Sequence, residues 1–356
     1  MKCRVCGKEH ELISSTLKVC KDCIVNEFDS IREEIAEVHR KCREVYSLPY
    51  PPPRGGIKCE LCSNECSIPP GERGFCGLRE NSGGLKSIVS AEVGLLHYYL
   101  DPHVTNCCAS WFCPGGTSAG YPEYSPVNGP EIGYYNLAVF FYGCNFNCLF
   151  CQNHEHKNLE FGKLVSKDQL SSLCREERIT CLCYFGGSPE PHLPFSIRLG
   201  NEVKDHVRVC FEWNGCGNKS LVRKAGEISF ESGGIVKFDL KTFSEELSLA
   251  LCGVSNRRAY ENFETLYHEF YDERKEPFLT ATTLLVPGYV DEEEVRNISE
   301  FLSSLNPEIP YSLLVFYPQH YMSDLPVTPR EQVKRCYEAA KEKLKRVHIG
   351  NLHLLL

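Results

Sequence analysis

Three closely spaced cysteines that follow an apolar segment constrain this chain more than any other feature. Residues 136–142 (NLAVFFY) are mostly apolar and predict a buried β-strand. Cys144, Cys148 and Cys151 come directly after this strand, with the spacing C-x3-C-x2-C. A structural zinc site takes four ligands, and the motif offers three thiols. Three thiolates suit an iron–sulfur cluster with one iron left open, with a zinc knuckle or three unrelated thiols as the alternatives.

Composition narrows the classes of protein to which the chain can belong. Its 356 residues allow two to three domains. The net charge of −8, without a long basic run, gives nucleic-acid binding no electrostatic support. No apolar run reaches the length of a membrane span, and no signal peptide opens the chain. We therefore expect a cytoplasmic protein with neither nucleic-acid nor membrane partners.

The 22 cysteines point to metal binding. Disulfide scaffolds are typically short secreted domains, whereas these cysteines cluster as C-x2-C pairs and triplets in a long chain. Such usage favours metal and cluster ligation in a reducing, oxygen-poor cell. Most of the following seven cysteines, which stand outside the clusters, are predicted to be small buried hydrophobic residues: Cys42, Cys174, Cys181, Cys183, Cys210, Cys252 and Cys336.

Residues 1–48 are expected to form a small module around one metal ion. Cys3, Cys6, Cys20 and Cys23 make two C-x2-C pairs at a spacing close to that of zinc ribbons. Zinc is the default ion, and a rubredoxin-like iron is the alternative, because both accept four sulfur ligands. An amphipathic helix is predicted over residues 24–45, before a proline-rich linker that cannot continue it.

Residues 49–130 are expected to form a second cysteine-rich module. Cys59, Cys62, Cys66 and Cys76 have the spacing C-x2-C-x3-C-x9-C and predict a second metal site. A structural zinc ion and a second iron–sulfur cluster both fit this spacing.

The same segment carries three further cysteines, Cys107, Cys108 and Cys113. Adjacent cysteines rarely bind one metal together, so we expect at most two of these three to be ligands. A packed loop lined by thiols is an equal alternative. His103 is predicted to be a packed or capping residue rather than a ligand.

From residue 131 onward, apolar segments alternate with amphipathic ones, a pattern typical of a parallel α/β sheet. Predicted strands cover 135–142, 180–186, 207–213, 234–240, 277–286, 311–316 and 345–349. Predicted helices cover 166–178, 192–203, 217–227, 243–268, 291–304 and 328–345. Six or seven repeats fall short of a closed barrel of eight. The predicted fold is therefore α/β, with a partial (β/α)6 TIM-like barrel over 131–356, and its chemistry is expected at the carboxyl ends of the strands.

The sequence GCNFNCLFCQN around Cys144 resembles the signature of radical S-adenosylmethionine (SAM) enzymes, in the branch that includes pyruvate formate-lyase activating enzyme. The resemblance runs from about Gly133 to the C-terminus. It implies that Cys144, Cys148 and Cys151 hold a [4Fe–4S] cluster whose open iron binds SAM. Reductive cleavage of SAM would then give a 5′-deoxyadenosyl radical that abstracts hydrogen. The segment CELCSNECSIPPGERGFCGLREN resembles a block that precedes the barrel in other radical SAM relatives.

Later motifs resemble the same family, each after a successive predicted strand. Residues 185–191 (FGGSPEP) are similar to the glycine-rich motif that binds the methionyl amino group, with Ser188 as an insertion before Glu190. Residues 212–215 (EWNG) replace an acidic-Thr-Asn-Gly sequence, and 239–241 (DLK) and 285–289 (LVPGY) resemble Asp-x-Lys and Val-Pro-Gly motifs. The resemblance implies SAM contacts from Gly186, Gly187, Ser188, Glu190, Glu212, Asn214, Asp239, Lys241 and Pro287.

The resemblance leaves two enzymatic functions open. One is hydrogen abstraction from a protein or peptide, as in the activation of glycyl radical enzymes, with an electron donor such as ferredoxin or flavodoxin. The other is cobalamin-dependent C-methylation of a protein residue, such as the glutamine of methyl-coenzyme M reductase, although the sequence lacks the D-x-H-x-x-G cobalamin motif. A non-enzymatic iron–sulfur or zinc scaffold is a third alternative, disfavoured by the intact SAM motifs.

Overall fold

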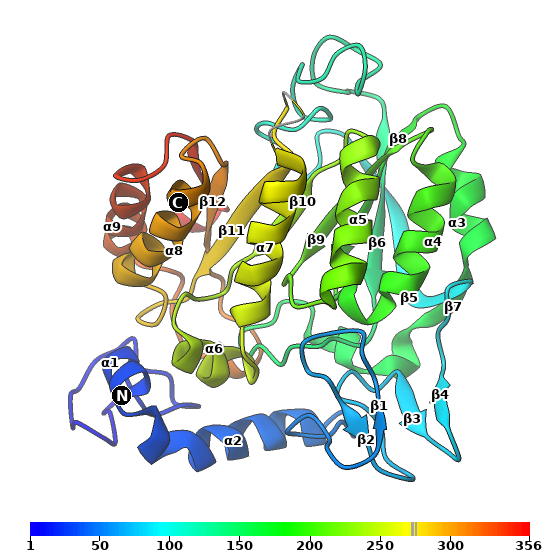
Figure 1. Cartoon of the computed structure of the whole chain (residues 1–356). Helices are drawn as coiled ribbons and strands as arrows, with labels where there is room; N and C mark the ends of the chain where they lie inside the picture. Colours follow the sequence, from blue (N-terminus) through cyan, green and yellow to red (C-terminus); the bar gives the residue numbers. More distant parts are fainter. Residues whose placement is uncertain (272–273, 275) are drawn as a thin grey trace.

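One large, mostly parallel sheet forms the centre of the molecule (Figure 1). The computed structural model describes residues 1–271, 274 and 276–356. In this part of the chain, nine strands form the sheet in the order β13-β12-β11-β10-β9-β8-β6-β5-β7. The parallel strands are β6 (Tyr135–Phe141), β8 (Ile179–Gly186), β9 (Arg208–Trp213), β10 (Val236–Asp239), β11 (Leu279–Leu285), β12 (Tyr311–Val315) and β13 (Val347–Gly350). The predicted α/β partial barrel is confirmed.

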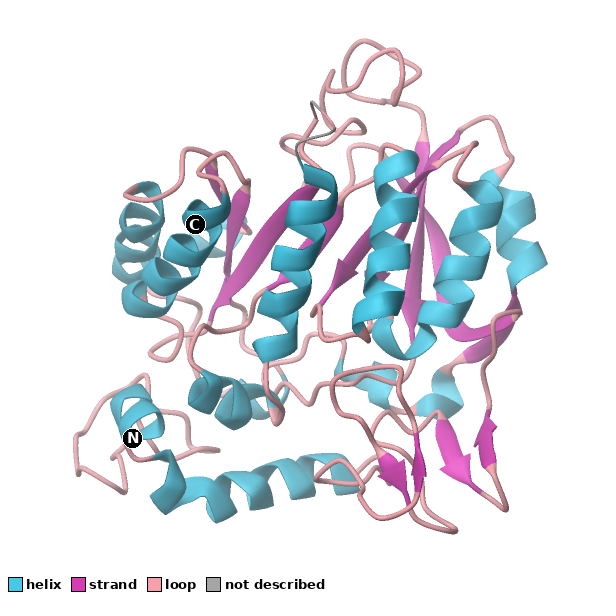
Figure 2. Cartoon of the chain, in the orientation of Figure 1, coloured by secondary structure: helices cyan, strands magenta, loops and turns pink. Residues whose placement is uncertain are grey.

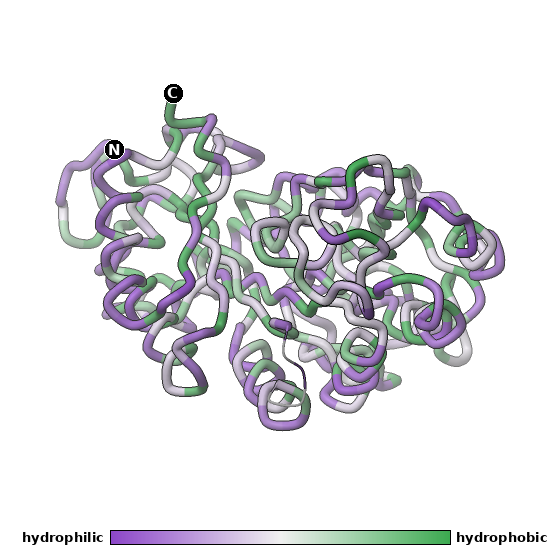
Figure 3. Tube along the Cα trace, turned by 90° about the horizontal axis from the view of Figure 1, so that it is seen from above, coloured by the Kyte–Doolittle hydropathy of each residue, from purple (hydrophilic) through white to green (hydrophobic). Residues whose placement is uncertain are grey.

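Helices connect the parallel strands and, except for the one at Glu245–Cys252, which lies at the carboxyl edge, cover the outer face of the sheet (Figures 1 and 2). They are α3 (Lys167–Cys174), α4 (Leu193–Val203), α5 (Lys219–Glu231), α6 (Glu245–Cys252), α7 (Arg257–Phe270), α8 (Glu292–Leu305) and α9 (Arg330–Lys341). In the view from above, the outward turns of these helices are largely hydrophilic (Figure 3). Each helix on the outer face therefore buries one apolar stripe against the strands.

The single helix predicted over 243–268 is wrong, because the structure has two helices there. Gly253 ends α6 with φ +74°, the left-handed conformation that glycine adopts at helix ends. Its N–H bonds to the carbonyl oxygen of Leu249, which completes the cap. The prediction missed this break because Gly253 is the only glycine in an otherwise helical pattern.

Two antiparallel strands that the sequence did not indicate extend the sheet. They are β5 (Val93–Pro102), which pairs with β6, and β7 (Lys163–Ser166), which pairs with β5. The sheet thus receives a strand from the segment predicted as a second module. Tyr98, Tyr99 and Leu100 are consecutive exposed residues of β5, so the strand lacks the alternation that marks a half-buried strand.

The N-terminal 90 residues lie beyond the carboxyl ends of the parallel strands, at the bottom of Figure 1. They contain α1 (Lys21–Asn26), α2 (Phe28–Glu44), β1 (Ile57–Lys58), β2 (Ser67–Ile68), β3 (Arg79–Asn81) and β4 (Leu85–Ser87). The helix predicted over 24–45 is interrupted at Glu27, whose φ of −131° is not helical. Short 3-10 helices elsewhere cover His154–Lys157, Leu159–Phe161, Glu190–His192, His320–Met322 and Leu352–Leu355.

None of the described helices combines the length and the apolar character that crossing a membrane requires.

The first N-terminal module docks on the loop that follows β11. Tyr289 in this loop is fully buried, and its hydroxyl accepts a hydrogen bond from Ser14 N and donates one to Val19 O, both at 3.0 Å. Lys21 adds ion pairs to Asp291 and Glu293 at 2.8 and 2.7 Å. The module is therefore fixed to the loop that carries Pro287.

Replacing Tyr289 by Phe should loosen this docking. The change leaves Ser14 N and Val19 O unpaired, which costs about 1–3 kcal/mol of the free energy of unfolding. Hydrogen exchange of residues 1–25 should become faster, whereas exchange in the barrel strands should not change. Tyr260→Phe is the control, because the Tyr260 hydroxyl bonds to Thr242 O, away from the module. Unchanged exchange in Y289F would contradict the docking contact.

Candidate metal and cofactor site

The predicted cluster loop leaves β6 at the carboxyl edge of the sheet. Gly143, between the strand and Cys144, has φ +83°, and a Cβ atom there would lie 2.9 Å from the carbonyl oxygen of Cys76. A side chain at this position would thus collide with the second cysteine-rich segment. Glycine lets the chain turn here while that segment packs directly against the loop.

Neighbouring elements hold the backbone of the cluster loop from two sides. Asn147 N donates to Cys252 O at 2.8 Å, and Leu149 N donates to Leu251 O at 2.9 Å. Both acceptors are at the C-terminal end of α6, where carbonyl groups have no partner within the helix. Tyr321 N donates to Leu149 O at 2.9 Å from the loop after β12. The position of the three thiols is therefore fixed by the fold.

Buried charges act on the three thiols. Burial, followed by the Cys148 thiol, raises the pKa of Cys144 to about 12. A hydrogen bond with the Cys252 thiol, followed by the ammonium groups of Lys241 and Lys157, lowers the pKa of Cys148. Two lysines beside the loop thus favour thiolates there, and thiolates are the form that binds metals.

The glycine-rich turn after β8 lies against the end of β6. Gly187 has φ +67°, and a Cβ atom on it would lie 2.0 Å from the carbonyl oxygen of Phe141. Only glycine fits this approach. The turn and the cluster loop are thereby brought together, as the resemblance implies.

Ser188 and Glu190 belong to a buried polar network that joins three turns. Ser188 Oγ lies 2.6 Å from both Asn145 Oδ1 and Glu190 Oε2. Glu190 Oε1 accepts a hydrogen bond from Gly215 N at 2.8 Å, and Asn214 Nδ2 donates to Asn145 Oδ1 at 2.8 Å. Burial raises the pKa of Glu190 to about 7. The contacts of these side chains are to the cluster loop and to the turn after β9.

The turn after β10 provides a carboxylate and an ammonium group next to the cluster loop. Asp239 and Lys241 form an ion pair, and Lys241 Nζ lies 5.8 Å from the centre of the Phe150 ring. Although burial acts in the opposite direction, the Asp239 carboxylate raises the pKa of Lys241. Pro287 is buried in the loop after β11, under the N-terminal module.

Glu212 lies apart from that pair, one strand away. Its carboxylate lies 3.3 Å from Lys237 Nζ, inside the barrel. Burial raises the pKa of Glu212 to about 7. Glu212 was expected to contact SAM, but its partner in the structure, Lys237, lies on the inner face of the sheet.

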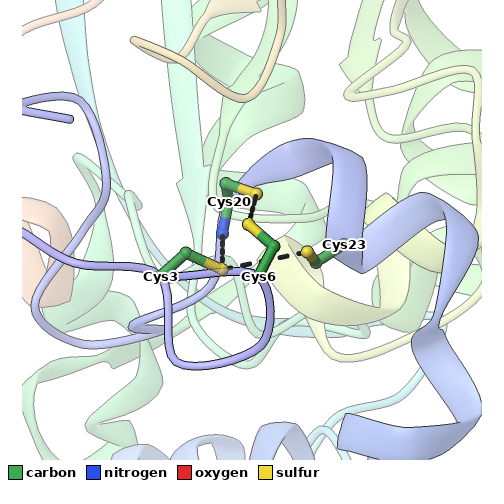
Figure 4. Close-up of side chains that lie close together, drawn as sticks. All are labelled: Cys3, Cys6, Cys20 and Cys23. Atoms are coloured by element: carbon green, nitrogen blue, oxygen red, sulfur yellow. Dashed lines mark hydrogen bonds between the residues drawn. The ribbon is translucent and has the colours of Figure 1, made fainter. Parts of the chain in front are cut away.

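The four N-terminal cysteines converge on one point (Figure 4). Their sulfur atoms all lie within 4.8 Å of one another, with Cys3–Cys23 and Cys6–Cys20 separations of 3.8 Å. Thiolates bound to zinc at 2.3 Å in a tetrahedron lie about 3.8 Å apart. Against the effect of burial, backbone N–H groups, led by that of Cys20, lower the pKa of Cys3 to about 6. The geometry fits one tetrahedral ion.

The donor atoms of the other predicted metal sites are less closely grouped. Within the described residues, only one further group of three donor atoms is as compact as the N-terminal site, namely Cys107, Cys108 and Glu212. The sulfur atoms of Cys144, Cys148 and Cys151 lie farther apart, as do those of Cys59, Cys62, Cys66 and Cys76. The latter four are nevertheless neighbours, because after burial the Cys76 thiol is the next cause that raises the pKa of Cys62.

Sequence comparison matches the central part of the chain to a known family. Residues 138–302 match the model of the radical SAM superfamily. The chain is 24% identical over 308 residues to an uncharacterized protein of Methanocaldococcus jannaschii, a match that covers 83% of this chain and 81% of the relative. It is 26% identical over 217 residues to pyruvate formate-lyase 1-activating enzyme of Escherichia coli, covering 57% of this chain and 81% of that enzyme.

A solved domain of a pyruvate-formate lyase-activating enzyme from Bacteroides vulgatus aligns with a TM-score of 0.38 and 19% identity, over 48% of this chain and 98% of that domain. The chain thus contains a radical SAM domain, and the family recognised from its motifs is confirmed.

Such a domain implies a [4Fe–4S] cluster and SAM, and the residues at the carboxyl edge fit both groups. The three cysteines of the loop are free, and thiolates that bind separate irons need not be as close as those on one ion. Asp239 Oδ1 is buried without a hydrogen-bond partner among the described residues, which leaves an acceptor for an amino group. Beside it, the Lys241 ammonium suits a carboxylate.

Several residues around the site escaped sequence reasoning. Cys252 was interpreted only as a buried hydrophobic residue, yet its thiol contacts that of Cys148. Arg43 is fully buried in α2 and donates to Pro49 O at 2.7 Å and to Phe75 O. Asn147 bonds to His39 and Lys157, both at 2.8 Å. A charged residue in a short amphipathic helix carries no sequence signal for burial, so Arg43 could not be found from its neighbours alone.

Removing the N-terminal thiols should remove one metal ion and leave the cluster intact. Cys6→Ser with Cys20→Ser breaks the four-sulfur site, so the variant should contain one zinc per chain less than the wild type. Cys174→Ser with Cys336→Ser is the control, because these buried cysteines lie outside every predicted site. Elemental analysis checks the count. An unchanged zinc content in C6S/C20S would refute the site.

Replacing the charged pair after β10 should weaken SAM binding without loss of iron. Charge-assisted hydrogen bonds contribute about 1.5–3 kcal/mol, so Asp239→Asn or Lys241→Ala should raise the Kd of SAM roughly tenfold or more. Equilibrium binding and iron content are measured on the same samples. Lys343→Ala, on the far side of the barrel and paired with Glu300, is the control. Loss of iron together with SAM binding would assign the pair to folding instead.

Proposed function

We propose that the protein is a radical SAM enzyme that takes a hydrogen atom from a protein or peptide substrate. The observation that carries the proposal is the position of Cys144, Cys148 and Cys151. They lie within the matched domain, at the carboxyl edge of a parallel barrel, beside the Asp239–Lys241 pair. When bound, the cluster and SAM would supply a 5′-deoxyadenosyl radical that abstracts hydrogen.

The residues of the chain would bind, orient and shield these groups. Asp239 and Lys241 would hold the zwitterionic methionine end of SAM, and Gly186 and Gly187 let the turn after β8 pack directly against Phe140 and Phe141 beside the cluster loop. Lys157 and Lys241 stabilise the thiolates electrostatically. Phe146 and Phe150 are buried beside the cysteines and exclude water from the loop.

The second cysteine set packs against the cluster loop, and this contact supports a role in electron transfer to the first set. The carbonyl oxygen of Cys76 lies against Gly143, and Asn64 Nδ2 donates to Asn145 O at 2.8 Å. The buried Arg43 guanidinium interacts electrostatically with Cys144 and Cys76. For such a role, Cys59, Cys62, Cys66 and Cys76 would hold a second cluster, which is the alternative to a zinc ion at these four cysteines. We infer a relay from a donor such as ferredoxin or flavodoxin through this cluster.

The macromolecular substrate is inferred from the relatives. The E. coli relative activates pyruvate formate-lyase, a protein, and it matches this chain along 81% of its own length. This chain adds an N-terminal cover of about 90 residues over the carboxyl edge, which offers surface for a protein partner. Modification of a polypeptide by hydrogen abstraction is therefore the function that the site supports best.

Replacing Cys144, Cys148 and Cys151 by Ala should abolish the formation of deoxyadenosine, while the N-terminal zinc remains. With the wild-type enzyme and a deuterated polypeptide substrate, deuterium should appear in deoxyadenosine. Mass spectrometry of deoxyadenosine measures both effects, with the C174S/C336S variant as a fully active control.

Two results would overturn parts of the proposal. If the triple variant cleaved SAM as fast as the wild type, these three cysteines would not hold the cluster. If the deuterium in deoxyadenosine came only from a small metabolite, the substrate would not be a polypeptide. If label transfer required cobalamin and left a methyl group on the polypeptide, the enzyme would be a methyltransferase.

A further inference from the structure

A loop from the N-terminal extension enters the inner face of the barrel. Cys108 O accepts hydrogen bonds from Trp111 Nε1 at 3.1 Å and from Ser312 Oγ, on β12, at 3.0 Å. Ala109 and Phe112 are buried against Cys183 of β8 and Cys210 of β9. The loop is thereby anchored to strands on both sides of β10, and His103, bonded to Thr180, is a packing residue there.

This loop brings two thiols to a carboxylate of the sheet. Cys107 Sγ, Cys108 Sγ and a carboxylate oxygen of Glu212 all lie within 4.8 Å of one another. Ala109 N lies 3.4 Å from Cys107 Sγ, in position to donate a hydrogen bond to a thiolate. Glu212 Oε2 is buried and has no hydrogen-bond partner among the described residues, although Lys237 Nζ lies 3.3 Å away. The three donor atoms converge from two separate parts of the chain.

A buried lysine side chain already lies beside these donor atoms. Lys237 is nearly inaccessible to solvent, and its Nζ lies 3.0 Å from Cys107 Sγ and 3.3 Å from Cys183 Sγ. One lysine therefore lies beside two thiols and a carboxylate, so the donor atoms outnumber the cations next to them. Metal binding would displace the thiol protons and add positive charge to this buried group.

We propose that Cys107, Cys108 and Glu212 bind a thiophilic divalent ion, zinc by preference, in the interior of the barrel. Two thiolates and a carboxylate are ligands that zinc accepts, and three protein ligands leave a fourth position for an exogenous group. Its ligand Glu212 lies on β9, the strand beside the one that carries Asp239. Cys113 is not part of this donor group. The inference concerns a metal and does not depend on the identity of the substrate.

The interior has room for the rearrangement that metal binding requires. A cavity of about 30 Å³ adjoins Cys107, Cys183, Cys210 and Lys237. It is large enough for a water-sized group. When the ion binds, the Lys237 ammonium can move from the thiols toward this space.

The test is a metal count on the full chain, isolated without oxygen. Zinc and iron are measured by mass spectrometry in the wild type and in C107S/C108S. The double variant should contain one divalent ion per chain less, while the N-terminal zinc and the cluster iron remain as internal references. C181S/C210S is the matched control, because these two thiols lie 3.7 Å apart on the same inner face, and no third donor among the described residues forms a compact group with them. Its count should equal that of the wild type.

A second, more conservative variant distinguishes loss of the metal site from misfolding. Glu212→Gln keeps the shape of the side chain and removes one anionic ligand, so the Kd of Zn²⁺ at this site should rise at least tenfold in competition with a chromophoric chelator. Equal metal counts in C107S/C108S and wild type, or an unchanged Kd in E212Q, would overturn the site. So would a Cys107–Cys108 disulfide in the anaerobic protein. An enzyme that binds this zinc but cleaves no SAM would refute only the proposed function.

Discussion

Backbone hydrogen bonds between the N-terminal extension and the turns of the barrel hold the candidate site together. Ser63 N donates to Cys216 O at 2.9 Å, and Asn218 N donates to Leu61 O at 3.0 Å, which fixes the second cysteine segment on the turn after β9. The Tyr289 hydroxyl does the same for the first segment on the loop after β11. The buried apolar side chains of these segments belong to the same core as the barrel, so this docking contributes to ordering them.

The regular part of the fold was accessible to sequence reasoning. Seven parallel strands lie where apolar segments predicted them, because strands buried on both faces read as continuous apolar runs. The antiparallel strand β5 was missed since its exposed Tyr98, Tyr99 and Leu100 break any alternation. The division of the long predicted helix at Gly253 depends on one left-handed residue, whose conformation local sequence does not specify.

The site was predictable at the level of motifs and less so at the level of contacts. Glycine at position 187 is required by a 2.0 Å approach to Phe141 O, so the motif and its physical reason agree. By contrast, Glu190 bonds to Gly215 N, and Glu212 pairs with Lys237. Both partners are distant in sequence and are brought close only by the order of strands in the sheet. The contact of Cys252 with Cys148 arises in the same way, through the end of α6.

Spacing separates the cysteine sets by the kind of metal centre that each suits. Sulfur atoms 3.8 Å apart, as at Cys3–Cys23, match the edge of a tetrahedron around one ion. The cluster loop is wider, and thiolates attached to different irons of one cubane meet no such limit. The two kinds of site also differ in their charges: Lys157 and Lys241 act on the cluster loop, whereas backbone N–H groups stabilise a thiolate at Cys3. Fixed positive charge would stabilise the reduced form of a buried iron–sulfur cluster, because reduction adds negative charge to the site. The N-terminal cysteines also have a buried lysine nearby, Lys21, but its ammonium group pairs with Asp291 and Glu293, so backbone N–H groups rather than a lysine lower the pKa of Cys3.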